Sequence, residues 1–394
     1  MTAAAVREGP WLSRNLIVLC AVSFAQDAAS ELLYPILPIF LTVTLGAPVA
    51  VVGAVEGLAE GAASVSRLLS GRLADRRAKR PLIAAGYGLA ALGKVVVAVA
   101  FAWPVVLLGR VVDRLGKGIR GAPRDALLVV GVPLGARGRA FGLHRAMDTA
   151  GAVVGPLLGL AGYELLHHHL RPLLALAVVP AVISVTLVRL VREGPALPAR
   201  AGRTVTAEPL PREYWRTLAV LVAFSLVNFP DALVLLRVAE LSHSVVFVIV
   251  AYVAYNAVYA AASYPAGALA DRLGPRRVIA VGLLCFAVTY GGLGLATSTA
   301  AVWPLLAVYG FFAAATDGVG KSWISSLAPA GAQGRAQGLY QGFIGGGVLV
   351  AGVWAGLAWH GDGRGPLLAS GCVAVLLAAV VAAPRVLSRE KVVA

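Results

Sequence analysis

One apolar stretch of the sequence, residues 104–130, carries seven charged side chains, six of which recur at a helical spacing and could hold a charged solute. At 100° per residue, a helix places all six within an arc of about 120°, so they form one polar stripe. A Lys or Arg that faces lipid at the centre of a membrane costs about 2.5–3.5 kcal/mol, so in a membrane the stripe must face water or acidic partners. Its members are Arg110, Asp113, Arg114, Lys117, Arg120 and Arg124.

Carboxylates occur at helical spacing in the apolar stretches that precede this one. Asp27 and Glu31 lie four residues apart, as do Glu56 and Glu60, so each pair shares one helix face. Burial raises the pKa of a carboxyl group and a nearby cation lowers it, so alternating pairing is a way to load and release a proton. We predict that Asp27, Glu31 and Glu60 couple proton uptake to the release of substrate from the cationic stripe. The alternative is a permanently paired structural network.

The composition indicates that these charges lie in a membrane protein. Of 394 residues, 59% are apolar and 13% are charged, where soluble domains have about 45–50% and 25%. Twelve membrane spans use about 240–300 residues, which leaves no room for an added catalytic domain. The net charge of +15 is what Lys and Arg in cytoplasmic loops produce, so we expect no nucleic-acid partner.

Apolar stretches separated by charged or turn-forming clusters predict an all-α membrane protein with twelve transmembrane helices. Basic clusters at 72–80, 137–139 and 272–277 place the loops after the second, fourth and eighth spans in the cytoplasm, with both termini. An interfacial amphipathic helix at 104–130 is the alternative for the fourth span. The predicted spans are 15–45, 48–70, 82–103, 104–130, 140–165, 170–190, 215–241, 243–268, 278–299, 301–327, 333–360 and 365–385.

The two halves of the chain repeat. GRLADRRAKR begins at Gly71 and GALADRLGPRR at Gly267, an offset of 196, and GARGRAFGL and GAQGRAQGL are also 196 apart. Such duplication is how secondary transporters build a central site between two bundles. We predict a six-helix bundle at 1–191, a cytoplasmic linker at 192–214 and a second, pseudo-symmetric six-helix bundle at 215–394.

The repeated block resembles the loop motif of the major facilitator superfamily, Gly-x-Leu-x-Asp-Arg-x-Gly-Arg/Lys-Arg/Lys, and the resemblance covers essentially the whole chain. It implies that the motif stabilises the state closed to the cytoplasm, and a carboxylate facing a helix N-terminus gives a physical reason. The alternative is that the motif only anchors the topology. The predicted gating residues are Gly71, Asp75, Arg76, Gly267, Asp271 and Arg272.

The fifth predicted span is similar to the glycine motif of the antiporter branches of the superfamily. Glycines four residues apart let helix backbones approach closely, and Pro156 removes a backbone donor, so we expect a packing seam that meets the opposite half. A purely structural kink is the alternative. The motif residues are Gly142, Gly151, Gly155, Pro156 and Gly159.

Four polar residues share one face of the span at 243–268: Tyr252, Tyr255, Asn256 and Tyr259. Aromatic rings with a polar tip suit an amphipathic organic substrate, although such a face also occurs in core packing and in lipid-interface belts. The predicted substrate-cavity residues are Arg110, Arg114, Lys117, Arg120, Tyr252 and Asn256.

These features predict a secondary transporter that works by alternating access and exports an anionic, zwitterionic or amphipathic solute with proton coupling. The alternatives are an organic-anion uniporter or symporter and a divalent-metal exporter. The chain has no HExxH, GxSxG or paired Cys and His, so we expect no enzyme activity, cofactor or metal. The expected partners are protons, a small-molecule substrate and the lipid bilayer. We expect a monomer in a bacterial inner membrane.

Overall fold

The computed structural model describes residues 11–34, 36–167, 169–193, 209–359 and 361–383, which form helices joined by short loops. The predicted linker lies mostly outside these residues, as do the two ends of the chain. The predicted boundaries of the bundles, 1–191 and 215–394, therefore stay predictions.

The first half of the chain forms one bundle. Its helices follow the predicted spans, and single 3₁₀ turns and one π-helical turn, Phe40–Thr44, extend some of them. The helices are α1 (Arg14–Leu33), α2 (Leu37–Ile39), α3 (Val49–Arg76), α4 (Lys79–Ala98), α5 (Trp103–Leu128), α6 (Arg137–Leu165), α7 (Leu170–Leu176) and α8 (Val178–Val188).

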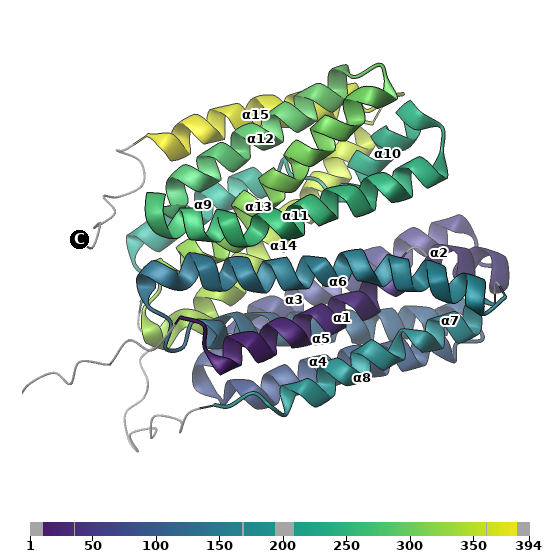
Figure 1. Cartoon of the computed structure of the whole chain (residues 1–394), viewed down its shortest axis with the longest axis horizontal. Helices are drawn as coiled ribbons and strands as arrows, with labels where there is room; N and C mark the ends of the chain where they lie inside the picture. The colour runs from purple at the N-terminus through teal and green to yellow at the C-terminus, as the bar shows by residue number, and fades with distance from the viewer. Residues whose placement is uncertain (1–10, 35, 168, 194–208, 360, 384–394) are drawn as a thin grey trace, which may run out of the picture.

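The second half forms a matching bundle, drawn in green and yellow beside the purple and blue of the first in Figure 1. Its helices are α9 (Arg212–Ser225), α10 (Asp231–Ser242), α11 (Val245–Leu273), α12 (Pro275–Leu295), α13 (Val302–Leu327), α14 (Gln333–Leu357) and α15 (Arg364–Ala382).

The helices are consistent with twelve spans. Within the described residues, eight helical segments are long and apolar enough to cross a membrane by length and composition. Three predicted spans are interrupted: the span at 15–45 divides into α1 and α2, the span at 170–190 into α7 and α8, and the span at 215–241 into α9 and α10. Pro230 precedes α10 and has no backbone N–H to continue a helix through this point.

The charged helix α5 lies inside the first bundle. Gly93 and Gly109 bring α4 and α5 so close that a Cβ on either glycine would meet the other helix's backbone. The side of α5 that faces α3 is equally tight at Gly118. An interfacial position for 104–130 is therefore wrong, because the helix is enclosed by its neighbours.

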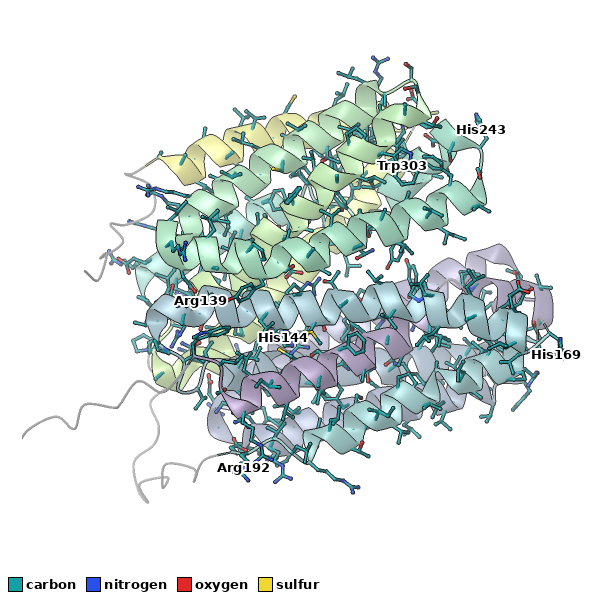
Figure 2. The ribbon with its side chains drawn as sticks, viewed as in Figure 1. Arg139, His144, His169, Arg192, His243 and Trp303 are labelled. Carbon is teal, nitrogen blue, oxygen red and sulfur yellow. The ribbon has the colours of Figure 1, made fainter. Side chains whose placement is uncertain are left out.

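Figure 2 distinguishes the two ends of the molecule. Arg139 and Arg192 lie at one end, and His169 and His243 lie at the other. His144 lies between them on α6. The end that holds Arg139 is called the latch end below, because the strongest contacts between the bundles occur there.

Candidate functional site

A cavity of about 690 Å³ lies between the bundles. Residues of α1, α3, α5 and α6 form one wall, and residues of α10, α11, α13 and α14 form the other. Its charged lining residues are Asp27, Glu31, Glu56, Glu60, Arg67, Arg114, Lys117, Arg120, Arg124, Arg145, Asp148, Asp231, Asp317 and Lys321. The cavity is therefore a polar chamber shared by both halves.

The cationic stripe of α5 divides into paired and unpaired members. Arg110 lies beside the cavity rather than on its wall, with its guanidinium 2.7 Å from Glu56 and 3.5 Å from Asp113. Asp113 also accepts a hydrogen bond from Lys94 at 3.0 Å, deep between α4 and α5. The predicted role of Arg110 as a substrate ligand is therefore replaced by a place in a buried ion network.

Arg120 is the stripe residue best placed to meet an anion. It lines the cavity, is only 4% exposed, and its Nη1 has no hydrogen-bond acceptor within the described part of the chain. Its guanidinium lies 4.4 Å above the ring of Tyr87. A buried donor without an acceptor costs about 1–3 kcal/mol, so an anionic ligand group here would be stabilised.

Lys117 and Asp27 also line the cavity, and neither has an ion pair or hydrogen bond among the described residues. The predicted proton-coupling acids Glu60 and Asp27 differ in whether they form an ion pair. Glu60 pairs with Arg67 at 3.0 Å and lies 3.9 Å from Arg114, whereas Asp27 is free to change its charge without breaking a direct contact.

The tyrosine face of α11 is on the cavity wall. Tyr252 donates a hydrogen bond to Glu31 at 2.9 Å and so connects the two bundles, and Tyr255 donates to Asp231 at 2.6 Å. Asn256 lines the same wall and donates to the backbone of Tyr252. The sequence alone did not pair these tyrosines with acids, since the partners lie on other helices.

Two ion pairs close the floor of the cavity towards the latch end. Asp125 of α5 lies 3.1 Å from Lys321 of α13, and Arg145 of α6 lies 2.6 Å from Asp317 of α13. Asp125 and Lys321 are 196 residues apart, the offset of the internal repeat. Each is thus the other's counterpart under the pseudo-two-fold axis, and the repeat could have revealed the pair.

Below this floor, the repeated motif forms two equivalent contacts, which we call the latches. Asp75 accepts the backbone N–H groups of Gly334 and Arg335 at 2.7 and 2.8 Å, where α14 begins. Asp271 accepts those of Gly138 and Arg139 at 2.7 and 2.9 Å, where α6 begins. Each carboxylate therefore satisfies the free donors of a helix N-terminus in the opposite bundle.

The other motif residues allow this approach. Gly267 lies against Gly138 with no room for a Cβ, and Gly71 lies in the same way against Gly338. Arg76 and Arg272 are exposed at the ends of α3 and α11. The sequence placed all of these residues at the cytoplasmic ends of helices, and the structure brings the glycines and aspartates into the contacts between bundles.

The glycine seam of α6 differs from the prediction. Gly142 contacts α11 in the opposite bundle, but Gly151 and Gly155 contact α1 in their own bundle, and Gly159 faces α1 beside them. Nine residues at 100° separate Gly142 from Gly151, so they occupy opposite sides of the helix. The expectation that the whole seam meets the other half is therefore wrong. Pro156 lies within α6, which continues through it.

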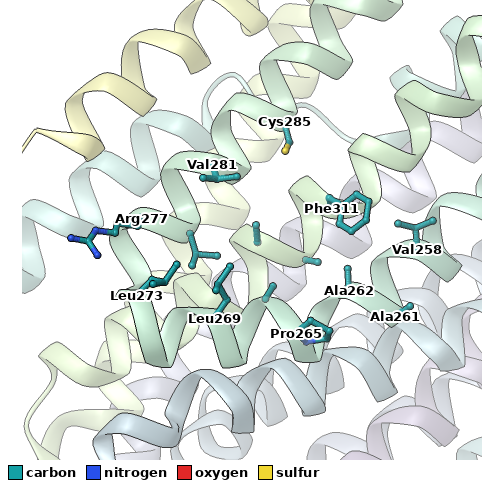
Figure 3. A pocket seen from close by; sticks show the side chains of 14 residues that line it. Val258, Ala261, Ala262, Pro265, Leu269, Leu273, Arg277, Val281, Cys285 and Phe311 are labelled. Atoms are coloured by element: carbon teal, nitrogen blue, oxygen red, sulfur yellow. The ribbon is translucent and has the colours of Figure 1, made fainter.

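A second hollow, of about 830 Å³, lies between α11, α12 and α13 (Figure 3). Its lining is apolar apart from Arg277 at one end, and several lining residues, including Leu269 and Val281, are strongly exposed. Exposed apolar side chains in a membrane protein face lipid. This groove therefore belongs to the lipid-facing surface and offers no polar groups for a soluble substrate.

Comparison with known proteins identifies the family. The profile of the Major Facilitator Superfamily matches residues 19–238 and 217–393, which together span nearly the whole described chain. The chain belongs to the major facilitator superfamily. An uncharacterized transporter of this type from Methanocaldococcus jannaschii is 30% identical over 357 residues, 88% of this chain and 89% of that protein. This major facilitator is thus an integral membrane transporter.

Other relatives match over shorter stretches or by structure alone. The multidrug resistance protein MdtH of Cronobacter sakazakii is 35% identical over 126 residues, 32% of this chain and 31% of that protein. A crystal structure of the human organic anion transporter MFSD10 has a TM-score of 0.78 at 15% identity and covers 93% of this chain and 99% of that one. An outward-facing bacterial homologue of ferroportin has a TM-score of 0.74 at 18% identity and covers 94% of this chain and 98% of that one. These two structures show the same fold.

Proposed function

We propose that this major facilitator is a proton-coupled exporter of a small anionic, zwitterionic or amphipathic solute. The observation that carries the proposal is the set of unpaired charges in the shared cavity: Arg120 and Lys117 are available to an anionic group, and Asp27 is available to a proton. The partial match to multidrug resistance proteins supports export. Protons and one small solute are then the only partners besides lipid, and the protein acts as a monomer.

The latch end is the cytoplasmic end in this proposal. The basic clusters beside the latches favour this orientation in a bacterial inner membrane, with both termini in the cytoplasm. The structure then represents the state closed to the cytoplasm, held by the latches and by the two ion pairs of the cavity floor. Alternating access requires these contacts to separate while the cavity closes at its other end.

Proton coupling depends on charges that act on Asp27. Lys117, Arg145, Asp148 and Glu31 line the same cavity as Asp27, so a movement of any of these charges changes the balance between its protonated and ionised forms. Glu31 and Glu60 are the further proton sites in the proposal. Because Glu60 is held by Arg67 of the same helix, it becomes available only when this ion pair separates.

Proton flux in reconstituted vesicles tests this function. We expect an anionic or zwitterionic solute from a mixed panel to move protons in the parent protein. Arg120→Gln removes a charged donor worth about 1.5–3 kcal/mol, so the half-saturating concentration of that solute should rise at least tenfold. Arg171→Gln, outside the cavity, is the matched control and should not change it. The proposal fails if no solute moves protons, or if both variants behave alike.

A further inference from the structure

We propose that the cavity contains a second subsite, which binds an organic ammonium group at the end away from the latches. The substrate would then carry an ammonium group and an anionic group about 10 Å apart. This inference rests on the proposed function and names its substrate class. The residues, which we call the aromatic subsite, are Glu31, Tyr34, Asp231, Tyr252 and Tyr255.

The aromatic subsite joins carboxylates to ring faces. Tyr252 donates to Glu31 at 2.9 Å and Tyr255 donates to Asp231 at 2.6 Å, while the two rings stand at 84° with their centroids 5.5 Å apart. Tyr34, at the end of α1, is 44% exposed and lines the same part of the cavity. Rings and carboxylates from both bundles therefore converge on one volume.

The carboxylates of this subsite lack a cationic partner. Neither Glu31 nor Asp231 has a Lys or Arg nitrogen within 4 Å among the residues that the structure describes. Elsewhere in the cavity, Glu56, Asp148 and Asp317 each have an Arg partner. The tyrosine hydroxyls donate hydrogen bonds to the carboxylates of Glu31 and Asp231 but do not neutralise their negative charge. A cationic group is therefore the ligand that this subsite lacks.

An organic ammonium suits this environment better than a small ion. A ligand cation over a tyrosine face gains about 0.5–1 kcal/mol when exposed and about 2 when desolvated. A quaternary ammonium donates no hydrogen bonds, so it does not compete with the tyrosines for the carboxylate oxygens. Its positive charge lies near the carboxylates of Glu31 and Asp231, and its methyl groups contact the rings of the subsite tyrosines.

The distance to the anionic site follows from helix geometry. The Arg120 guanidinium lies 4.4 Å from the centre of the Tyr87 ring, and the Tyr87 hydroxyl lies 3.3 Å from the Ser23 hydroxyl, so Arg120 reaches about the depth of Ser23 on α1. Glu31 is eight residues from Ser23 away from the latches, about 12 Å along α1. The aromatic subsite and Arg120 are therefore on the order of 10 Å apart along the helix axes.

The sign of proton coupling agrees with an ammonium group. A proton that binds Asp27 or Glu31 removes a negative charge, which weakens the binding of a cation and strengthens the binding of an anion. Exchange of protons for substrate requires that each expel the other. The ammonium group supplies this competition, whereas a purely anionic solute would be held more tightly by the protonated cavity.

Three probes with one hydrocarbon length test the subsite: octanoate, octyltrimethylammonium and 8-(trimethylammonio)octanoate, whose charges are about 10 Å apart when extended. Calorimetric binding to the purified full-length protein should be tightest for the third. Asp231→Asn should weaken the two ammonium probes at least tenfold and leave octanoate unchanged. Arg120→Gln should weaken octanoate and leave octyltrimethylammonium unchanged. Asp362→Asn, outside the cavity, is the control for the acidic substitution.

Further variants separate the subsite from a general loss of folding. Tyr255→Phe keeps the ring, and Glu31→Gln replaces the other carboxylate, so either serves if Asp231→Asn does not fold. The shorter 4-(trimethylammonio)butanoate cannot span the two sites and should bind at least tenfold more weakly than the longer probe. The subsite is overturned if the ammonium probes do not bind, or if the acidic variants weaken octanoate equally. If octanoate alone binds and depends on Arg120, the anionic site of the proposed function stands without this subsite.

Discussion

Replacing Asp271 with Asn should open one latch. The carboxylate accepts the backbone N–H groups of Gly138 and Arg139, and it also accepts the Arg139 Nε at 3.1 Å. An amide at this position keeps one acceptor oxygen but loses the negative charge that faces the N-terminus of α6. The closed arrangement is therefore weakened, while the fold of each bundle is left intact.

The expected magnitude follows from these contacts. The loss of one charge-assisted hydrogen bond and of the interaction with the helix N-terminus costs about 1–2 kcal/mol. That energy changes the ratio of closed to open molecules by about 5–30-fold. Asp75→Asn should have a similar effect, since Asp75 accepts the equivalent pair of backbone N–H groups. The latches share no partner, so the double variant should lose about 2–4 kcal/mol.

The distance between spin labels at the latch end measures this ratio. Arg77→Cys and Arg277→Cys place labels on exposed positions of the two bundles, after Cys20, Cys285 and Cys372 are replaced. We expect one short distance in the parent, a second longer population in each single variant, and mainly the longer distance in the double variant. Asp362→Asn should match the parent. Unchanged distances in the double variant would refute the latch.

Two further predictions concern packing. Asp113→Asn leaves Lys94 buried without an ionised partner and should lower the free energy of unfolding by about 3–5 kcal/mol, whereas Lys94→Met with Asp113→Leu should cost less. Thermal unfolding in detergent compares them, and equal melting of all three proteins would contradict a buried ion pair. Gly142→Leu should lengthen the latch-end label distance, and Gly151→Leu should lower thermal stability without lengthening it, because the two glycines face different bundles. The reverse pattern would contradict this assignment.

The fold was predictable from the sequence to a large extent. Hydropathy located the helices, and the 196-residue repeat related the two bundles. The repeat also placed Asp75 and Asp271 at equivalent positions, because duplicated segments fold alike. The breaks in the predicted spans were harder to predict from hydropathy. Residues such as Asn228 and Pro230 interrupt a helix, while the stretch around them remains strongly apolar.

The pairing of charges was not predictable in the same way. Helical spacing places Arg110 and Arg120 on one stripe. It cannot show that Arg110 forms an ion pair with Glu56, or that Nη1 of Arg120 has no hydrogen-bond acceptor among the described residues. Lys94 was missed because its partner, Asp113, is reached only through the packing of α4 on α5, and the contact of Arg145 with Asp317 depends in the same way on the packing of α6 on α13. Spacing also shows which glycines share a face, and nine residues between Gly142 and Gly151 already indicate opposite faces.

Proton flux in vesicles that contain the Asp27→Asn variant decides whether this carboxylate couples protons to solute. We expect this variant still to exchange solute across the membrane, but to move no protons with it and not to accumulate solute against its gradient. Asp362→Asn should retain both activities. If Asp27→Asn moves as many protons for each solute molecule as the parent does, the unpaired carboxylate of the cavity is not the coupling site.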